Sequence, residues 1–218
     1  MNIQQNLYPF PHVIIKNYFD DFELKVIWEE LEFICYPQKL EPPEITGTAR
    51  DNGRNLKQNR GVWLNDVYRN HLTSSILSVN RKLFNSADII YKNHPHWYFH
   101  HNTTAYSTLL SYYENSDYYE SHMDQAYLTC LSWFYKEPKK FNGGNLYFPD
   151  YEDYTIEYDN NKAVLFPSGT KHAVTPIEMQ QDDCGKKLGR FCMSQFLSIE
   201  GENRLNMDSD DTRGRVND

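Results

Sequence analysis

The second half of the chain is built from many short apolar or alternating segments, and this pattern limits the fold more than any other. The segments span residues 97–101, 105–113, 127–135, 145–148, 154–158, 162–166, 171–175 and 188–199. Turn-forming residues such as Asn142-Gly143-Gly144 and Pro167-Ser168-Gly169 separate most of them. Strand-favouring Phe, Trp and Tyr make up 15% of the chain. Short strands at this spacing predict a mainly β sandwich or barrel.

The first half predicts helices that pack against the outer face of these strands. Residues 22–34 carry apolar side chains at mixed three- and four-residue spacing, which is typical of an amphipathic helix. Asp20 or Asp21 would cap this helix, and Pro37 would end it. A second helix is predicted over about 66–85.

Two further segments complete the first half. Val13-Ile14-Ile15 is a short β-like run before the first helix. Residues 36–60 are rich in Pro, Gly, Asp and Asn and carry few apolar residues, which predicts a long loop. Loops of this length inside compact domains are often functional or mobile.

The length of 218 residues suits one domain with a substantial core. We predict a helix-rich N-terminal support over about 1–95, a β core over about 96–200 and a polar tail over 201–218. Internal repeats and interdomain linkers are absent from the sequence. The sequence contains no signal for an oligomeric state.

The charge and the cysteines narrow the classes of partner and compartment. A formal net charge of −8 opposes binding to nucleic acid and to anionic membranes. The first residues lack the pattern of a signal peptide, and no apolar run approaches the length of a membrane span. The four cysteines show no metal-binding or disulfide-framework spacing. We therefore expect a cytoplasmic protein that binds neither nucleic acid nor membrane.

His122 and Asp124 form the only His-X-Asp motif of the chain. In extended backbone, residues two apart point to the same side, so both side chains can reach one metal ion. Taken alone, this motif is better explained as a chance surface pair, because the chain has eight histidines and many aspartates. His172 follows the turn that ends at Thr170 and starts a predicted strand. Two imidazoles and one carboxylate make the facial triad of non-haem iron(II) oxygenases.

Arg190 lies in the last predicted strand, on the same face as Cys192, Ser194 and Phe196. Because both faces of this strand are largely apolar, we expect it to be buried on both sides. A buried arginine needs an anionic partner, and its planar fork suits a carboxylate. A structural salt bridge and a ligand-binding role are equally compatible with this position. In the second case, Arg190 could bind the far carboxylate of a 2-oxo acid that chelates the metal.

Residues 106–199 resemble the catalytic core of the 2-oxoglutarate- and Fe(II)-dependent dioxygenase superfamily, and within it the prolyl 4-hydroxylase-like branch. The similarity rests on the order and spacing of several stretches taken together. These are Tyr113 to Asp124, Phe141 to Phe148, Ala163 to Gly169 with His172 to Pro176, and Arg190. The resemblance implies a double-stranded β-helix (jelly-roll) fold and the cofactors Fe(II), 2-oxoglutarate and O₂, with ascorbate as an optional reductant.

The resemblance also implies roles for individual residues. His122, Asp124 and His172 would bind the iron and act through it in catalysis. Arg190 would bind the distal carboxylate of 2-oxoglutarate, and Ser194 would assist it. Tyr113 and Trp133 would line the same pocket, although ordinary core packing is the favoured explanation for these two aromatic residues.

The implied activity is hydroxylation of a prolyl residue in a peptide or protein. Hydroxylation of a free amino acid or another small metabolite is the main alternative. A non-catalytic jelly-roll binding module has no need to retain all three metal ligands, and the acidic charge disfavours nucleic-acid demethylation. We further hypothesise that the 36–62 loop, with Arg60 and Trp63 at its end, contacts substrate. An inert surface loop is the alternative.

Overall fold

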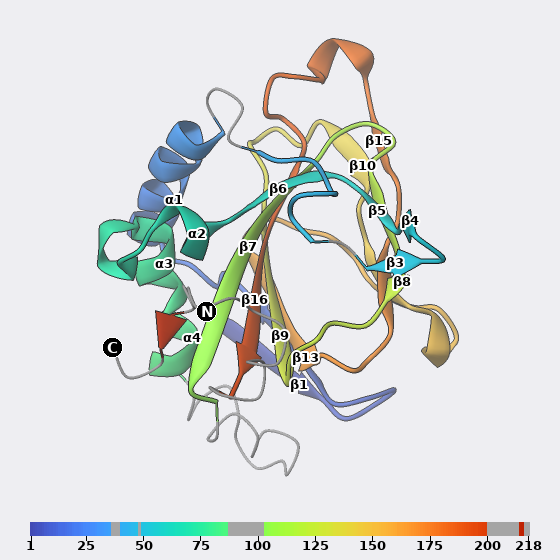
Figure 1. Cartoon of the computed structure of the whole chain (residues 1–218), viewed down its shortest axis with the longest axis horizontal. Helices are drawn as coiled ribbons and strands as arrows, with labels where there is room; N and C mark the ends of the chain where they lie inside the picture. The colour runs from blue at the N-terminus through green and yellow to red at the C-terminus, as the bar shows by residue number, and fades with distance from the viewer. Residues whose placement is uncertain (36–39, 48, 87–102, 200–213, 216–218) are drawn as a thin grey trace.

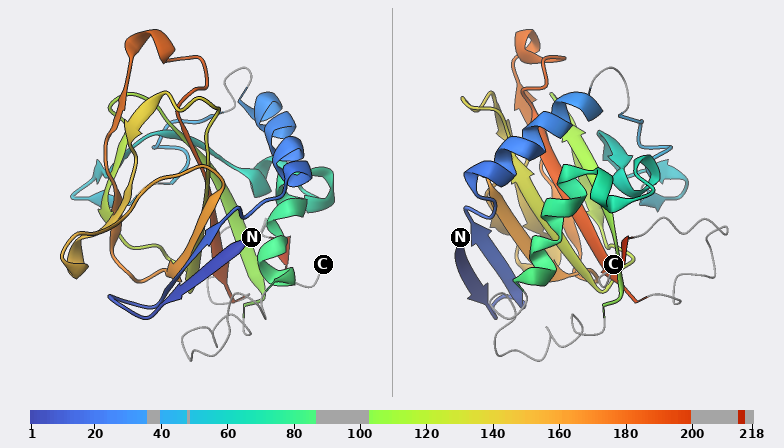
Figure 2. Two further views of the ribbon diagram at one scale, coloured as in Figure 1. Left: turned by 180° about the vertical axis from the view of Figure 1, so that it is seen from behind. Right: turned by 90° about the vertical axis from the view of Figure 1, so that its left-hand side faces the viewer.

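The computed structural model describes residues 1–35, 40–47, 49–86, 103–199 and 214–215 (Figure 1). The strands of this part form two large sheets and two small ones. Helices cover one side of the larger sheet (Figure 2). Among the described residues, every helix is too short or too polar to span a lipid bilayer.

The larger sheet has eight strands in the order β1-β2-β13-β9-β16-β7-β17, and β6 also pairs with β7. Its strands are β1 (Asn2–Asn6), β2 (His12–Lys16), β6 (Arg60–Trp63), β7 (Ala105–Tyr113), β9 (Leu128–Phe134), β13 (Lys162–Pro167), β16 (Arg190–Ser198) and β17 (Gly214–Arg215). The described side chains of β9 are all buried, and those of β7 and β16 nearly all, because each strand packs on both faces. The burial of β16 on both faces confirms the prediction made from its apolar pattern.

The second sheet has five strands in the order β12-β11-β14-β8-β5. Its strands are β5 (Lys57–Gln58), β8 (Tyr118–His122), β11 (Leu146–Phe148), β12 (Tyr154–Ile156) and β14 (His172–Val174). Two short pairs complete the β structure: β3 (Arg50–Asp51) with β4 (Arg54–Asn55), and β10 (Phe141–Gly143) with β15 (Ile177–Met179). One-turn 3₁₀ helices, η3 (Pro149–Tyr151) and η4 (Gln181–Asp183), follow β11 and β15.

An aromatic core fills the space between the two large sheets. It contains Trp133 and Cys192 from the larger sheet and Phe148 and Val174 from the smaller one. The molecule is therefore mainly β, with its strands folded into a double-stranded β-helix, as predicted.

A separate core lies between the larger sheet and the helices. Helix α1 (Asp21–Ile34) buries Ile27, Leu31 and Ile34 in this layer. Its N-cap is Asp20, whose side chain accepts from the Glu23 N–H while the Glu23 carboxylate accepts from the Asp20 N–H. The predicted first helix is thus confirmed with its cap, while Pro37 lies outside the described residues.

The prediction of one continuous helix over 66–85 was wrong. This stretch holds α2 (Leu64–Val67), η1 (His71–Thr73), α3 (Ser75–Asn80) and α4 (Lys82–Asn85). The breaks occur where short polar side chains bond to the backbone. Asn70 Oδ1 accepts from the Leu72 N–H, and Ser74 Oγ accepts from the Leu77 N–H as a new N-cap. Such bonds compete with a continuous helix.

The predicted 36–60 loop was also wrong in part, because its described residues include β3, β4 and β5. Strand β5 extends the smaller sheet by pairing with β8, and β1 and β2 extend the larger one, so the first 95 residues are not simply helical. Strand β17 of the polar tail pairs with β7. The rest of that tail and the predicted 97–101 strand lie outside the described residues.

Candidate metal centre

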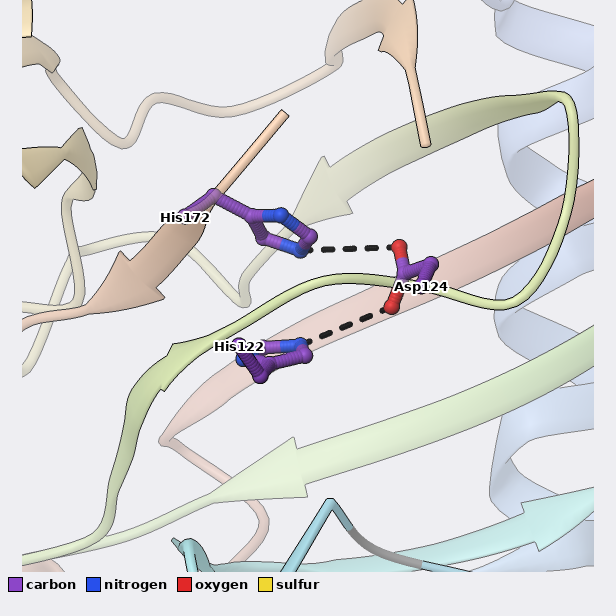
Figure 3. A group of neighbouring side chains, drawn as sticks. All are labelled: His122, Asp124 and His172. Carbon is purple, nitrogen blue, oxygen red and sulfur yellow. Dashed lines mark ion pairs between the residues drawn. The ribbon is translucent and has the colours of Figure 1, made fainter. Parts of the chain in front are cut away.

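The side chains of His122, Asp124 and His172 point toward one another (Figure 3). His122 ends β8 and lies directly across from His172, the first residue of the neighbouring antiparallel strand β14. One ligand atom from each of the three side chains lies within 4.8 Å of the others. Asp124 Oδ1 is 3.5 Å from His122 Nε2, and Asp124 Oδ2 is 3.5 Å from His172 Nε2. This arrangement suits one divalent metal ion.

Asp124 lies just beyond the end of β8, so strand alternation does not by itself aim its carboxylate. Instead, its backbone N–H donates to the Ser168 carbonyl at 3.1 Å. Its Oδ2 accepts from Thr129 Oγ1 at 2.7 Å, and that hydroxyl also lies 2.8 Å from Ser168 Oγ. Thr129 and Ser168 therefore hold the carboxylate in place.

Both imidazoles present the same nitrogen to the metal position. His122 Nδ1 lies 2.8 Å from the Glu120 carbonyl, and His172 Nδ1 lies 2.9 Å from the Thr170 carbonyl. Because a carbonyl can only accept, each Nδ1 carries the proton and each Nε2 keeps a free lone pair. These backbone contacts thus select the tautomer that binds a metal.

The charges of the three ligands also suit a cation. Burial lowers the pKa of His172 to about 4, so this imidazole is neutral near pH 7. Burial raises the pKa of Asp124, but His122, His172 and Thr129 outweigh this effect, and the pKa ends below its usual value. Near pH 7, Asp124 is therefore ionised and His172 is neutral, and these are the forms that bind a metal ion.

The lowered pKa of His172 predicts that acid destabilises the metal-free protein. The unfolded His172 takes up a proton below pH 6.5, whereas the folded one does so only below about 4, so acidification favours the unfolded chain. We expect a loss of up to about 3 kcal/mol of unfolding free energy between these values. Urea unfolding at several pH values checks this. His172→Gln should reduce the pH dependence of the unfolding free energy. A wild-type unfolding free energy that stays the same over this pH range would contradict the prediction.

Thr129 gives a second prediction. Thr129→Val removes the hydroxyl that fixes Asp124 while keeping the shape of the side chain. We expect metal affinity to fall about 10- to 100-fold, because residues that orient ligands typically contribute this much. Competition with a metal chelator measures the effect. Thr129→Ser, which keeps the hydroxyl, should bind metal nearly as wild type, and equal loss in both variants would refute the role.

Arg190 is fully buried inside the β-helix and has no acidic partner among the described residues. Its Nε donates to the Gly144 carbonyl at 3.0 Å, while neither Nη has a hydrogen-bond partner in the described part of the chain. The guanidinium carbon lies 4.7 Å from the Tyr113 ring centroid and 4.6 Å from that of Tyr158. The structural salt bridge is therefore not seen here, and a guanidinium edge remains available for an anion.

Gly144 keeps the space that the Arg190 side chain occupies. A Cβ at Gly144 would lie 2.7 Å from Arg190 Cδ and 2.6 Å from Ile177 Cδ1, and the residue has a φ of +71°. Only glycine combines this backbone angle with such a close approach.

The other residues predicted for the pocket lie around Arg190. Tyr113 is the cross-strand partner of Arg190, and the Trp133 ring lies 5.8 Å from the guanidinium carbon. Ser194 shares the Arg190 face of β16, and its Oγ lies 3.7 Å from Cys192 Sγ. The structure thus gathers Tyr113, Trp133 and Arg190 and places Ser194 farther along the same strand.

Sequence reasoning missed two aromatic residues of this region. The Tyr158 ring lies beside the Arg190 guanidinium. Its hydroxyl is 2.7 Å from the Phe134 carbonyl and 2.8 Å from the Phe191 carbonyl. The Tyr119 ring stacks on His122 with 3.6 Å between centroids and 12° between planes. Tyrosines recur so often in this chain that their positions carried no signal.

Arg60 and Trp63, which were predicted to contact substrate, both donate hydrogen bonds to backbone carbonyls of segment 40–47. Arg60 is exposed and donates to the Leu40 carbonyl at 3.5 Å. Trp63 Nε1 donates to the Thr46 carbonyl at 3.0 Å, and its ring packs on Phe196. Both residues tie segment 40–47 to β6, and their contact with substrate stays a prediction.

A family model described as the 2OG-Fe(II) oxygenase superfamily matches residues 108–198, which include all three candidate ligands and Arg190. Residues 108–198 belong to this superfamily. The triad and the open guanidinium fit the Fe(II) and 2-oxoglutarate that a 2OG-Fe(II) oxygenase uses. No curated protein matches the chain.

Solved structures similar to this chain include two prolyl hydroxylases. One is a Pseudomonas putida prolyl-4-hydroxylase, with 13% identity, a TM-score of 0.52, and coverage of 87% of this chain and 93% of that chain. Another is a Trichoplax adhaerens prolyl hydroxylase in complex with a peptide fragment of hypoxia inducible factor, with 13% identity, a TM-score of 0.60, and coverage of 90% and 87%.

A third similar structure has a different activity. It is SnoN, a non-heme alpha ketoglutarate dependent epimerase from nogalamycin biosynthesis, with 9% identity, a TM-score of 0.53, and coverage of 94% of this chain and 93% of that chain. At such identities the likeness of all three structures extends to the fold alone.

Proposed function

We propose that this oxygenase hydroxylates a prolyl residue in a peptide or protein, using Fe(II), 2-oxoglutarate and O₂. The proposal rests on one observation above all. The two-histidine, one-aspartate cluster lies inside the same β-helix as a fully buried arginine whose Nη atoms have no partner among the described residues. The prolyl specificity is supported by the similar structures, several of which are prolyl hydroxylases.

Each residue has a defined task in the proposed reaction. His122, Asp124 and His172 hold the iron through two Nε2 atoms and one carboxylate. Arg190 orients the cosubstrate by pairing with its distal carboxylate, and the rings of Tyr113 and Tyr158 keep water away from that pair. When bound, iron and 2-oxoglutarate supply an oxidation in which decarboxylation to succinate and carbon dioxide is coupled to hydroxylation of a C–H bond.

With three protein ligands, a bound metal would keep open positions for the cosubstrate and O₂. The Nδ1–H bonds to Glu120 and Thr170 keep both imidazoles from rotating during turnover. The chain supplies position and charge, and no protein acid or base is needed at the reacting carbon.

The test is an assay of proline-containing peptides against free amino acids. Purified protein with Fe(II), 2-oxoglutarate and ascorbate should form succinate and add one oxygen atom to the prolyl ring of a peptide. Mass spectrometry of the peptide and quantification of succinate give the two readouts. Succinate formation only with free proline or another small metabolite would replace the peptide by the small-molecule alternative. A protein that binds ligand without any turnover would support the non-catalytic alternative.

We also propose ascorbate as the reductant, and a cytoplasmic location. All four cysteines are free thiols, as expected in a reducing compartment. The acidic net charge of −8 is consistent with a peptide or small-molecule substrate rather than a nucleic acid.

A further inference from the structure

Lys57 lies on the inner face of the smaller sheet, the face that also carries the histidine ligands. It pairs with Tyr119 of β8, and Tyr119 pairs with Val174 of β14. Paired residues of neighbouring strands project to the same face. Because Val174 belongs to the core between the two sheets, Lys57 also points inward. Its exposed fraction is only 4%, although β5 is the edge strand.

Asn59 repeats this orientation two residues later. Lys57 and Asn59 are buried, at 4% and 3% exposure, whereas Gln58 and Arg60 between and after them are exposed. This alternation is that of an extended chain with one face turned inward. Segment 57–60 thus passes from the smaller sheet to the larger one and lines the interior with an ammonium and an amide.

The Lys57 ammonium and the Asn59 amide oxygen each lack a hydrogen-bond partner among the described residues, whereas Asn59 Nδ2 donates to the Arg60 carbonyl at 3.3 Å. Among the described residues, the Lys57 ammonium forms no ion pair and no hydrogen bond, and its Nζ lies 5.8 Å from the centroid of the Tyr119 ring. That same ring stacks on His122. Asn59 Oδ1 is buried and likewise has no hydrogen-bond partner in the described part of the chain. Burial lowers the pKa of Lys57 to about 8, and no carboxylate in the described part of the chain offsets this effect.

A lysine with only 4% exposure and no anion among the described residues destabilises a fold, so its retention points to an anion that arrives with a ligand. The cosubstrate does not meet this need, because its distal carboxylate is matched by Arg190. Arg190 lies on β16 of the larger sheet, whereas Lys57 lies on β5 of the smaller one, beside the strand that ends in His122. Arg190 and Lys57 therefore offer two separate cationic positions within the described residues.

We propose that Lys57, with Asn59 beside it, binds a carboxylate of the substrate. This inference rests on the proposed function and narrows it, since the preferred prolyl substrate then carries a carboxylate close to the ring that is hydroxylated. That carboxylate belongs either to a C-terminal prolyl residue or to an acidic residue next to the proline, and the experiment separates these two sources.

The experiment measures binding rather than turnover. The full chain, loaded anaerobically with Fe(II) and 2-oxoglutarate, is titrated by calorimetry with acetyl-alanyl-proline, its C-terminal amide, and the amide of acetyl-aspartyl-proline. We expect one of the two carboxylate probes to bind about 10- to 100-fold more tightly than the neutral amide, as charged hydrogen bonds allow. The tighter probe identifies the source of the carboxylate.

Variants at position 57 assign this preference to the lysine. Lys57→Met should lose it, Lys57→Arg should keep most of it, and Gln58→Met, a change of the exposed neighbour, should leave it intact. Lys57→Met should also bind 2-oxoglutarate as wild type does. In the absence of ligand it should raise the melting temperature, because it removes an unpaired buried charge.

Several results would overturn the inference. These are equal affinity of wild type for all three probes, failure of every probe to bind, or a preference that survives in Lys57→Met. Loss of 2-oxoglutarate binding in Lys57→Met would assign the lysine to the cosubstrate, and a lowered melting temperature would show that it is already paired. Binding with the expected preference but without hydroxylation under O₂ would refute the proposed prolyl activity and leave the carboxylate site standing.

Discussion

Replacing His122 with alanine should abolish both iron retention and succinate formation. The variant leaves Asp124 and His172 as ligands, and two ligands hold a divalent ion far more weakly than three. Because loss of a residue that merely orients a ligand costs 10- to 100-fold in affinity, we expect loss of a ligand itself to exceed about 100-fold. Metal analysis after gel filtration and a succinate assay measure the two effects.

The adjacent Met123 provides a matched control for this experiment. Its side chain is 59% exposed and lies between the two ligands in sequence. Met123→Ala should retain iron and 2-oxoglutarate turnover, because its side chain supplies no ligand to the cluster. Wild-type metal content and turnover in His122→Ala would remove the basis of the metal centre.

Replacing Arg190 with methionine should weaken 2-oxoglutarate binding while leaving the metal in place. The change removes a guanidinium whose two Nη atoms are free for a carboxylate among the described residues. A charge-assisted, two-point contact in a buried site is strong, so we expect a loss of roughly 100-fold in affinity. The metal-free variant should be at least as stable as wild type, because an unpaired buried charge is replaced by an apolar side chain.

Titration of the Fe(II)-loaded protein with 2-oxoglutarate without O₂ measures this affinity, and thermal unfolding measures the stability. Lys139 is a suitable control, because its Nζ lies 5.7 Å from the same Tyr158 ring but the residue is exposed. Lys139→Met should bind 2-oxoglutarate as wild type does. Unchanged affinity in Arg190→Met would show that the cosubstrate uses another cation.

Most of the metal centre could be predicted from local sequence. The His-X-Asp motif and a histidine that begins a later strand predicted the three residues that the structure brings within 4.8 Å. The position of Asp124 was predicted for an incomplete reason, because β8 ends at His122 and the Ser168 carbonyl fixes the aspartate. A hydrogen bond to a residue so distant in sequence leaves no local pattern.

The burial of Arg190 was predicted from its strand. Side chains alternate between the two faces of a strand, and both faces of this one are largely apolar. The sequence could not decide between a structural ion pair and a ligand contact. That decision needed the three-dimensional neighbourhood, which places aromatic rings and the Gly144 carbonyl around the guanidinium.

The amino-acid sequence by itself determined the features that depend on near neighbours: the Asp20 cap of α1, the short strands of the β core and the order of the metal ligands. Tertiary structure alone decided that residues 57–58 form an edge strand beside β8, with Lys57 turned inward toward Tyr119. The physical reason is that periodicity and capping act within a few residues, whereas strand pairing joins segments far apart in the chain. Which distant strand completes a sheet depends on the packing of the whole core.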